Sequence, residues 1–193
     1  MKRLFALLVP LFLLSGCAAG QTDARAEDLQ QKYAALSGCD ARAAVAVVRD
    51  GETRQYTLDI AKDGDETRVT VLEPEALSGV SAVVSGDALS LEFDGMALDA
   101  GSADERISAV NATDIVLRAA ASGYVTERNT ERYEDMDALR LCFETEQDGE
   151  RLYVTAWFDA DDAPLYAEIE RDGEVLAYLE FTAFQFHDII SAE

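Results

Sequence analysis

The segment most informative about the fold is VTVLEPEALSGVSAVVSGDALSLEFDG, residues 69–95. Every second residue from 89 to 93 is apolar, which is the pattern of a strand with one buried face and one solvent-exposed face. Gly-Asp at 86–87 and Asp-Gly at 94–95 tolerate positive φ angles and close tight hairpins. The stretch therefore predicts consecutive antiparallel strands.

The same period-two pattern recurs on both sides of this stretch. Apolar and polar residues alternate in 56–60, 139–144 and 165–170. Turn pairs of Asp and Gly also recur, at 50–51, 63–64, 148–149 and 172–173. Hairpins that follow one another so closely predict a long antiparallel meander.

The final predicted strand, residues 176–186, is apolar on both faces. Strict alternation places Leu179, Phe181 and Ala183 on one side, and on the other side Tyr178, Phe184 and Phe186. We expect such a strand to be covered on both faces, or to separate a core from a cavity.

Two segments have a helical period instead. Apolar residues lie at i, i+4 and i+7 from Leu29, so residues 24–37 are predicted to form an amphipathic helix with Asp23 as its N-cap. Residues 102–123 predict one or two short helices that interrupt the sheet. The expected architecture is one α+β domain in which helices pack against an antiparallel sheet.

The first 16 residues have the layout of a signal peptide. Lys2 and Arg3 precede an apolar run, 4–14, that is shorter than the roughly 20 residues of a membrane-spanning helix. Residues 14–17, Leu-Ser-Gly-Cys, resemble the bacterial lipobox, in which the cysteine becomes the first residue of the mature chain. We therefore expect the thiolate of Cys17 to accept a diacylglyceryl group that anchors the protein. The alternative is a plain signal peptide that contains a cysteine.

With this anchor, residues 17–23 are predicted to be a lipidated tether and 24–193 a single domain. The expected location is the extracytoplasmic face of the cell membrane. The net charge of the whole chain is −22, and it becomes −24 once Lys2 and Arg3 are removed. So acidic a surface repels phosphate groups, which excludes nucleic acid as a partner.

Cys39 and Cys142 remain after lipidation of Cys17. Outside the cytoplasm, two such cysteines could form a disulfide. The alternative is two separate small residues, because Cys142 alternates with Leu141 and Phe143 and therefore points to the polar face of its strand.

Catalytic and metal-binding motifs are not found in the sequence. The one histidine, His187, precedes Asp188, but no nucleophile elbow accompanies the pair. The segment 159–164, DADDAP, lacks the glycine of a calcium loop, so we interpret it as a charged hairpin turn, with weak calcium binding as the alternative. No zinc spacing or glycine-rich phosphate loop occurs. We therefore expect no enzyme activity, no cofactor and no metal site.

The order of these features resembles the lipoprotein-carrier fold of LolA and LolB, and of the LppX-type lipoproteins. Two segments carry the resemblance, which covers roughly residues 24–188. One is 69–95, with its Pro-x-x-Leu-x-Gly corner at Pro74, Leu77 and Gly79, and the other is the late hairpin 163–186. The anchor is closer to LolB and LppX than to LolA, and the arginine that gates the LolA cavity has no counterpart. The resemblance implies a strongly curved antiparallel sheet, a half-barrel, with helices packed on its concave face.

Such a fold has an apolar interior that can hold acyl chains. Six aromatic residues are candidates for lining it: Tyr56, Phe93, Phe143, Trp157, Phe181 and Phe184. The expected function is a membrane-anchored extracytoplasmic module that binds a hydrophobic ligand, either a lipid or a lipoprotein acyl chain. The alternative is a surface interaction or scaffold lipoprotein, whose aromatic residues fill the core and leave no room for a small ligand.

Overall fold

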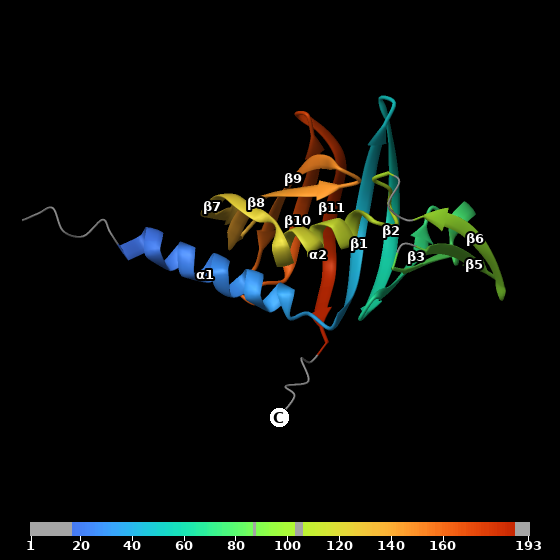
Figure 1. The fold of residues 1–193 in the computed structure, drawn as a ribbon, viewed down its shortest axis with the longest axis horizontal. Helices are drawn as coiled ribbons and strands as arrows, with labels where there is room; N and C mark the ends of the chain where they lie inside the picture. Colours follow the sequence, from blue (N-terminus) through green and yellow to red (C-terminus); the bar gives the residue numbers. More distant parts are fainter. Residues whose placement is uncertain (1–16, 87, 103–105, 188–193) are drawn as a thin grey trace, which may run out of the picture.

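The protein folds around one open antiparallel sheet of 11 strands (Figure 1). The computed structural model describes residues 17–86, 88–102 and 106–187. Neighbouring strands follow the order β6-β5-β4-β3-β2-β1-β11-β10-β9-β8-β7. The strands are β1 (Gly38–Arg49), β2 (Glu52–Asp63), β3 (Glu66–Glu73), β4 (Ser81–Ser85), β5 (Ala88–Phe93), β6 (Met96–Ser102), β7 (Tyr124–Tyr133), β8 (Met136–Gln147), β9 (Glu150–Phe158), β10 (Pro164–Arg171) and β11 (Glu174–Phe186).

The chain order explains how the sheet is assembled. Starting from β1 in the middle, β2 to β6 are added one by one toward one edge. The segment that contains α2 (Ala112–Ser122) leads to the opposite edge, and β7 to β11 return until β11 pairs with β1. The hairpin turns have the positive φ angles expected of Asp-Gly, for example 53° at Asp50 and 77° at Gly51. The predicted meander with one helical interruption is therefore confirmed.

Two helices, α1 (Cys17–Ala34) and α2, pack against one face of the sheet (Figure 1). We call this face concave and the opposite face convex. The predicted α+β class, a curved open sheet with helices on its concave face, is confirmed. The short 3-10 turn η1 (Glu75–Leu77) forms the corner between β3 and β4, where Gly79 has a φ of 85°.

Helix α1 differs from its predicted range. Its described part runs from Cys17, the first residue that the structure describes, to Ala34, so the predicted tether of residues 17–23 belongs to the helix. The alanines of this segment favour helix formation, which explains the earlier start. Asp23 is not an N-cap, because it lies inside the helix and its carboxylate pairs with Arg128 of β7 at 3.2 Å. The predicted signal peptide, 1–16, lies outside the described residues.

Helix α2 is the one helix described within the region 102–123, and residues 103–105 of the predicted capping box lie outside the description. Asn111 stabilises the preceding turn, since its Oδ1 accepts a hydrogen bond from the Ser108 N–H at 2.8 Å. Gly123 follows the helix as predicted and donates its N–H to the Ala119 carbonyl. A Cβ at Gly123 would lie 2.9 Å from the Cβ of Phe143, so the helix end and β8 approach too closely for a larger residue.

The hydrophobic core lies between the two helices and the concave face of β1, β2, β3 and β8 to β11. α1 contributes Leu29 and Tyr33, and α2 contributes Ile115 and Val116. Among the described residues, none of the core cluster comes from β4, β5 or β6. In Figure 1, β5 and β6 lie at the end of the sheet farthest from α1. The helices therefore cover only part of the concave face.

Strand β11 does not follow the strict alternation expected of it. Its pairing with β1 shifts at Arg42/Ala43, where Thr182 is the extra residue of a β-bulge. The bulge brings Phe181, Phe184 and Phe186 to the same concave face, whereas regular alternation would place Phe181 opposite the other two. The predicted division of this strand into two apolar faces is therefore wrong after Phe181.

Candidate functional site

The six candidate cavity residues do not form one cluster. Phe143 is fully buried in the core and packs edge-to-face on Phe158, with ring centroids 6.5 Å apart. Phe181 is also buried, and Phe184 packs against it from the same face of β11. These three candidates therefore line the helix-covered part of the concave face.

Side chains of helix α1 fill the space in front of these aromatic residues. The ring of Tyr33 lies 5.6 Å from that of Phe158, 6.5 Å from that of Phe184 and 5.6 Å from that of Phe186. The ammonium group of Lys32 lies 4.1 Å from the ring centroid of Phe186, which is a cation–π contact. In this part of the concave face, the predicted aromatic lining is packing between helix and sheet.

Trp157 is not on the concave face. Its neighbours in β9, Ala156 and Phe158, point into the core, so Trp157 points to the convex side. There its ring contacts Tyr166 and Tyr133, and its indole N–H donates to a carboxylate oxygen of Glu131. The prediction that Trp157 lines the interior is corrected by this register.

Phe93 is at the uncovered end of the sheet. It lies at the end of β5 and is 52% exposed, and Met96 and Leu98 of the paired strand β6 are each 67% exposed. The pairing of β3 to β6 places nine apolar residues on the same face together with Thr67 and Gly101, and no described strand residue of this face is charged. We call this set the wing face: Val69, Val71, Ala82, Val84, Leu89, Leu91, Phe93, Met96 and Leu98.

The wing face continues the core without a break. Val69 is buried opposite Ile60 of β2, and Val71 lies opposite Leu58. Tyr56, the remaining candidate, is half-buried on β2 and packs against the core cluster. Sequence reasoning identified Phe93 but not Met96 and Leu98, although both alternate with smaller or polar residues directly after the turn at 94–95. That alternation is the signal from which they could have been found.

Cys39 and Cys142 are both free, so the disulfide considered from the sequence is not present. Cys39 is buried on β1, and Cys142 lies on β8 opposite Thr155 of β9. Four strand-to-strand steps separate β1 from β8, roughly 19 Å at ordinary strand spacing, whereas a disulfide needs Cα atoms within about 7 Å. Burial raises the pKa of the Cys39 thiol to about 12. The alternative interpretation, two separate small residues, is the correct one.

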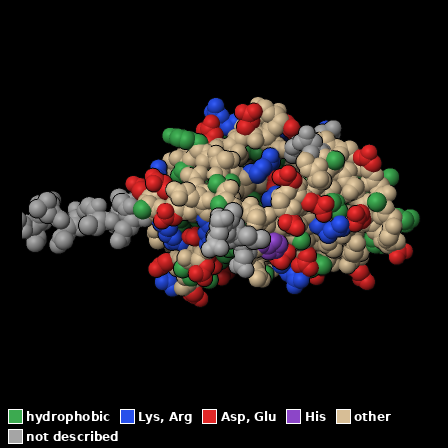
Figure 2. Space-filling model, turned by 60° about the horizontal axis from the view of Figure 1, so that its bottom comes forward, with side chains coloured by type: hydrophobic (Ala, Val, Ile, Leu, Met, Phe, Trp, Pro, Cys, Tyr) green, Lys and Arg blue, Asp and Glu red, His purple; other side chains and the backbone are tan. Residues whose placement is uncertain are grey.

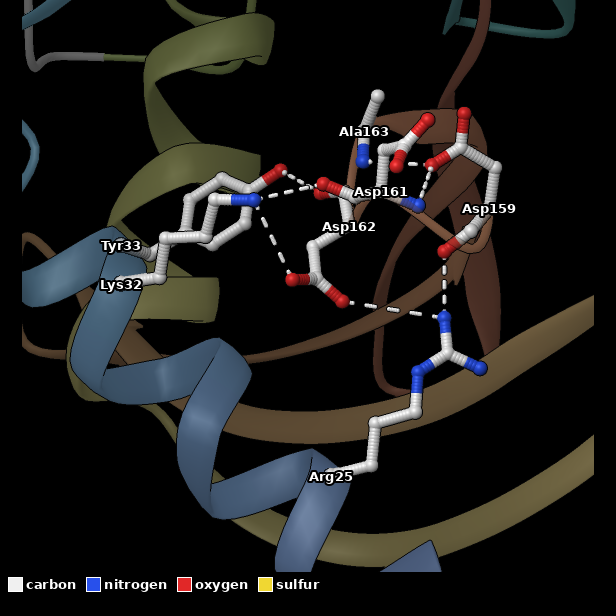
Figure 3. A network of polar contacts seen from close by, with 7 residues as sticks. All are labelled: Arg25, Lys32, Tyr33, Asp159, Asp161, Asp162 and Ala163. Atoms are coloured by element: carbon white, nitrogen blue, oxygen red, sulfur yellow. Dashed lines mark hydrogen bonds and ion pairs between the residues drawn. The ribbon is translucent and has the colours of Figure 1, made fainter. Parts of the chain in front are cut away.

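The acidic turn at 159–164 holds helix α1 against the sheet (Figure 3). Lys32 Nζ donates to the Asp161 carbonyl at 2.6 Å and to Asp162 Oδ2 at 3.3 Å. The Tyr33 hydroxyl donates to the Asp162 carbonyl at 2.8 Å. Arg25 donates to the Asp159 carbonyl and pairs with the carboxylate of Asp162. Protein cations thus occupy the oxygen-rich side of this turn, which favours a structural role over calcium binding.

Of the His187–Asp188 pair considered from the sequence, the structure describes His187 alone. His187 Nε2 lies 3.1 Å from Asp40 Oδ2, and the backbone N–H of His187 donates to the carbonyl of Gly38. Asp188 lies outside the described residues. Within residues 17–86, 88–102 and 106–187, no group of three or more His, Cys, Asp or Glu side chains is placed to hold a metal ion.

Side chains of opposite charge lie close together on the surface. Figure 2 shows one face of the molecule, on which acidic and basic side chains are interspersed. Several charged side chains form ion pairs across the sheet, such as Arg42 of β1 with Asp59 of the adjacent β2 at 2.6 Å, and Arg68 of β3 with Glu92 of β5, across β4, at 2.6 Å. Neither helix, over the part of the chain that is described, is long and apolar enough to cross a membrane.

No protein-family model and no curated protein matches this sequence. Solved structures resemble its fold. A LolA superfamily protein from Nitrosomonas europaea is 12% identical, covering 84% of this chain and 94% of its own, with a TM-score of 0.45. The lipoprotein LppX from Mycobacterium tuberculosis is 14% identical, covering 86% and 98%, with a TM-score of 0.45. An uncharacterized conserved protein from Thermus thermophilus is 15% identical, covering 87% and 89%, with a TM-score of 0.49.

The resemblance to LolA- and LppX-type proteins that the sequence suggested thus recurs among solved structures. At identities of 15% or less and TM-scores below 0.5, it concerns the fold alone.

Proposed function

We propose that this protein is a lipid-anchored, extracytoplasmic binding module that holds an acyl chain on the wing face. The observation that supports the proposal is that the helices cover only part of the apolar concave face. Its central part is packed under the two helices, whereas Phe93, Met96 and Leu98 remain exposed.

The wing face has the chemistry that an acyl chain requires. It spans four strands, about 14 Å at ordinary strand spacing, and none of its nine residues is charged in a chain with 28% charged residues. Contiguous exposed apolar surface of this kind marks binding sites more often than plain solvent-facing sheet. An acyl chain gains about 0.8 kcal/mol for each methylene group that it buries.

The test is the uptake of a fluorescent fatty acid by residues 18–193, which lack the acylated cysteine. We expect saturable uptake by the unchanged sequence and at least about tenfold weaker uptake by Leu98→Asp, because a carboxylate on the wing face opposes burial of an acyl chain. Tyr124→Asp is the matched control. Tyr124 is exposed on β7, at the other edge of the sheet, so this change should leave uptake unaltered.

The second candidate function is the protein-docking lipoprotein. The close packing of α1 and α2 on the concave face favours it, since that part of the interior is filled by side chains. Native mass spectrometry discriminates the two functions. Bound lipid on the unchanged protein that is lost in Leu98→Asp supports acyl binding, whereas bare protein together with absent probe uptake supports docking of a protein partner.

The lipid anchor is proposed on the sequence alone and has its own test. Cys17→Ala should abolish incorporation of labelled palmitate and release the protein from the membrane fraction or leave it as an uncleaved precursor. Cys39→Ala should retain the label, because Cys39 is buried on β1 and no apolar run precedes it. Labelling of the Cys17→Ala protein would disprove the proposed anchor.

A further inference from the structure

A groove of about 750 Å³ lies on the convex face, away from the helices. It is placed where the corner between β3 and β4 comes near β10 and β11. Its chemically distinctive lining residues are Glu73, Pro74, Glu75, Tyr166, Tyr178 and Glu180. Tyr56 of β2 also lines the groove, so three tyrosines and three carboxylates border the same hollow.

Small residues of β1 form the floor of the groove. Ala46 lies opposite Tyr178 of β11, and Ala44 lies opposite Glu180. A methyl group facing a large side chain leaves space above the sheet, and both alanines line the groove. The alternation of β1, which puts larger Val45 into the core, is what turns these alanines outward.

Neighbouring aromatic rings hold Tyr166 at the border of the groove. The ring of Trp157 lies 5.4 Å from it, and the ring of Tyr133 is stacked on it at 5.9 Å. The Tyr166 hydroxyl donates to Glu168 Oε1 at 3.1 Å. These contacts fix the ring without the help of a ligand.

The three carboxylates of the groove have no positive partner among the described residues. Most described Lys and Arg side chains pair with acids elsewhere, such as Lys62 with Asp114 at 3.1 Å and Arg151 with Glu144 at 2.9 Å. Glu73 accepts a hydrogen bond from the Thr57 hydroxyl at 3.1 Å, which leaves its charge uncompensated. The groove is therefore a place where negative charge and aromatic surface meet without a protein cation.

We propose that this groove binds an alkylammonium group. Carboxylates attract such a group over several ångströms, and a tyrosine ring adds a cation–π contact worth about 0.5–2 kcal/mol. A metal ion is a poorer match, because no three ligating side chains converge in the described residues. The ammonium group could belong to a free small amine or to a lysine side chain of a peptide.

This site is independent of acyl binding, since the wing face lies on the other side of the sheet. The experiment is calorimetric titration of the full chain, purified in a non-ionic detergent. The probes are choline, cadaverine and the peptide Gly-Lys-Gly. The neutral isostere of choline, 3,3-dimethylbutan-1-ol, controls for apolar binding.

We expect saturable binding of at least one ammonium probe, weakened when salt is raised from 50 to 500 mM, and no binding of the neutral isostere. Tyr178→Leu should weaken binding roughly 3- to 30-fold, whereas Tyr178→Phe, which keeps the ring, should retain it. Glu180→Gln should also weaken it. Tyr124→Leu and Asp65→Asn, which lie outside the groove, should not.

The outcomes of this experiment either identify where the ammonium group comes from or reject the proposed site. Binding of choline or cadaverine means that a free amine suffices. Binding of the peptide alone, with the same sensitivity to Tyr178→Leu, means that the ammonium group comes on a peptide. No binding of any probe, equal binding of the neutral isostere, or equal affinity of Tyr178→Leu and Tyr178→Phe would overturn the proposal.

Discussion

The two parts of the concave face have the same sequence pattern and different surroundings. In the central part of β8 (residues 139–143) and in β9 (residues 152–158), every second side chain is apolar and fully buried beneath α1 and α2. In β5 and β6, every second side chain is also apolar, yet Phe93, Met96 and Leu98 remain more than half exposed. Alternation therefore encodes which side of a strand is apolar, and the position of the helices determines whether that side is covered.

The topology accounts for the difference. The segment that leaves β6 must reach the far edge of the sheet to begin β7, and α2 ends directly before β7. α1 is fastened to the turn between β9 and β10 by Lys32 and Tyr33, which keeps it over the same part of the sheet. Both helices thus lie over the strands that are late in the chain.

The largest expected effect concerns the covered part. Phe143→Ala should lower the free energy of unfolding by about 3–5 kcal/mol, because it removes a fully buried ring and leaves a cavity beside Phe158. Urea denaturation followed by circular dichroism measures it. A loss below about 1 kcal/mol would mean that the helix-covered core is looser than its packing indicates.

The next expected effect is a pH dependence of the free energy of unfolding, which tests whether water is excluded from the helix-covered part of the concave face. The folded pKa of Cys39 is raised to about 12 by burial, so the thiol ionises first in the unfolded chain. Below about pH 8.5 the thiol is protonated in both states, so the free energy of unfolding has its full value. As the pH rises toward 12 the unfolded chain loses this proton first, and the free energy of unfolding falls by up to about 1.4 kcal/mol per pH unit. We expect Cys39→Ala to lack this component of the alkaline decline.

The control for this pH dependence is Cys142→Ala. Burial raises the pKa of Cys142 too, but this cysteine is only half-buried, on the convex face. Its replacement should therefore change the decline less than Cys39→Ala does. Identical alkaline denaturation curves for the unchanged protein and Cys39→Ala would show that water reaches β1.

A smaller effect is expected at the fastening of α1. Tyr33→Phe removes the hydrogen bond from the hydroxyl to the Asp162 carbonyl and should cost about 0.5–1.5 kcal/mol. The ring stays, so its contacts with Phe158 and Phe186 are kept. Tyr124→Phe, at an exposed tyrosine, should cost nothing measurable in the same thermal melts.

The smallest effect is expected on the wing face. Leu98→Ala should change the free energy of unfolding by less than about 0.5 kcal/mol, because two-thirds of this side chain already meets solvent. Urea denaturation, run in parallel with Phe143→Ala, gives the comparison directly. A cost comparable to that of Phe143→Ala would show that the wing face is covered in the folded protein.

The sequence predicted the sheet well because hairpin turns and alternation are local signals. Asp50-Gly51 and Asp94-Gly95 predict turns by their residue types, and these residues have the positive φ angles that such turns require. It failed where one residue changes the register. Thr182 carries no local sign that it is a bulge, so the face of Phe184 could not be derived. The start of α1 was missed because Asp23 reads as a cap, whereas its partner Arg128 is more than a hundred residues away.

The candidate site was harder to predict, since a binding site depends on what is left uncovered. Phe143 and Phe93 look alike in sequence, each at the end of an alternating apolar run. Only the long-range packing of α1 and α2 distinguishes them. The convex groove was invisible for a similar reason, because it joins the corner at Pro74 to Tyr178 of the last strand.

The continuous helix from Cys17 to the core-packing residues of α1 has a mechanical consequence. An α-helix advances about 1.5 Å and turns about 100° with each residue. With an acyl group on Cys17, the rotation of α1 about its axis would set the side toward which the wing face is oriented relative to the anchor. One residue inserted near Cys17 would rotate the domain by about 100° relative to the anchor. Seven inserted residues would nearly restore the original orientation and move the domain about 10 Å farther from the anchor along the helix axis.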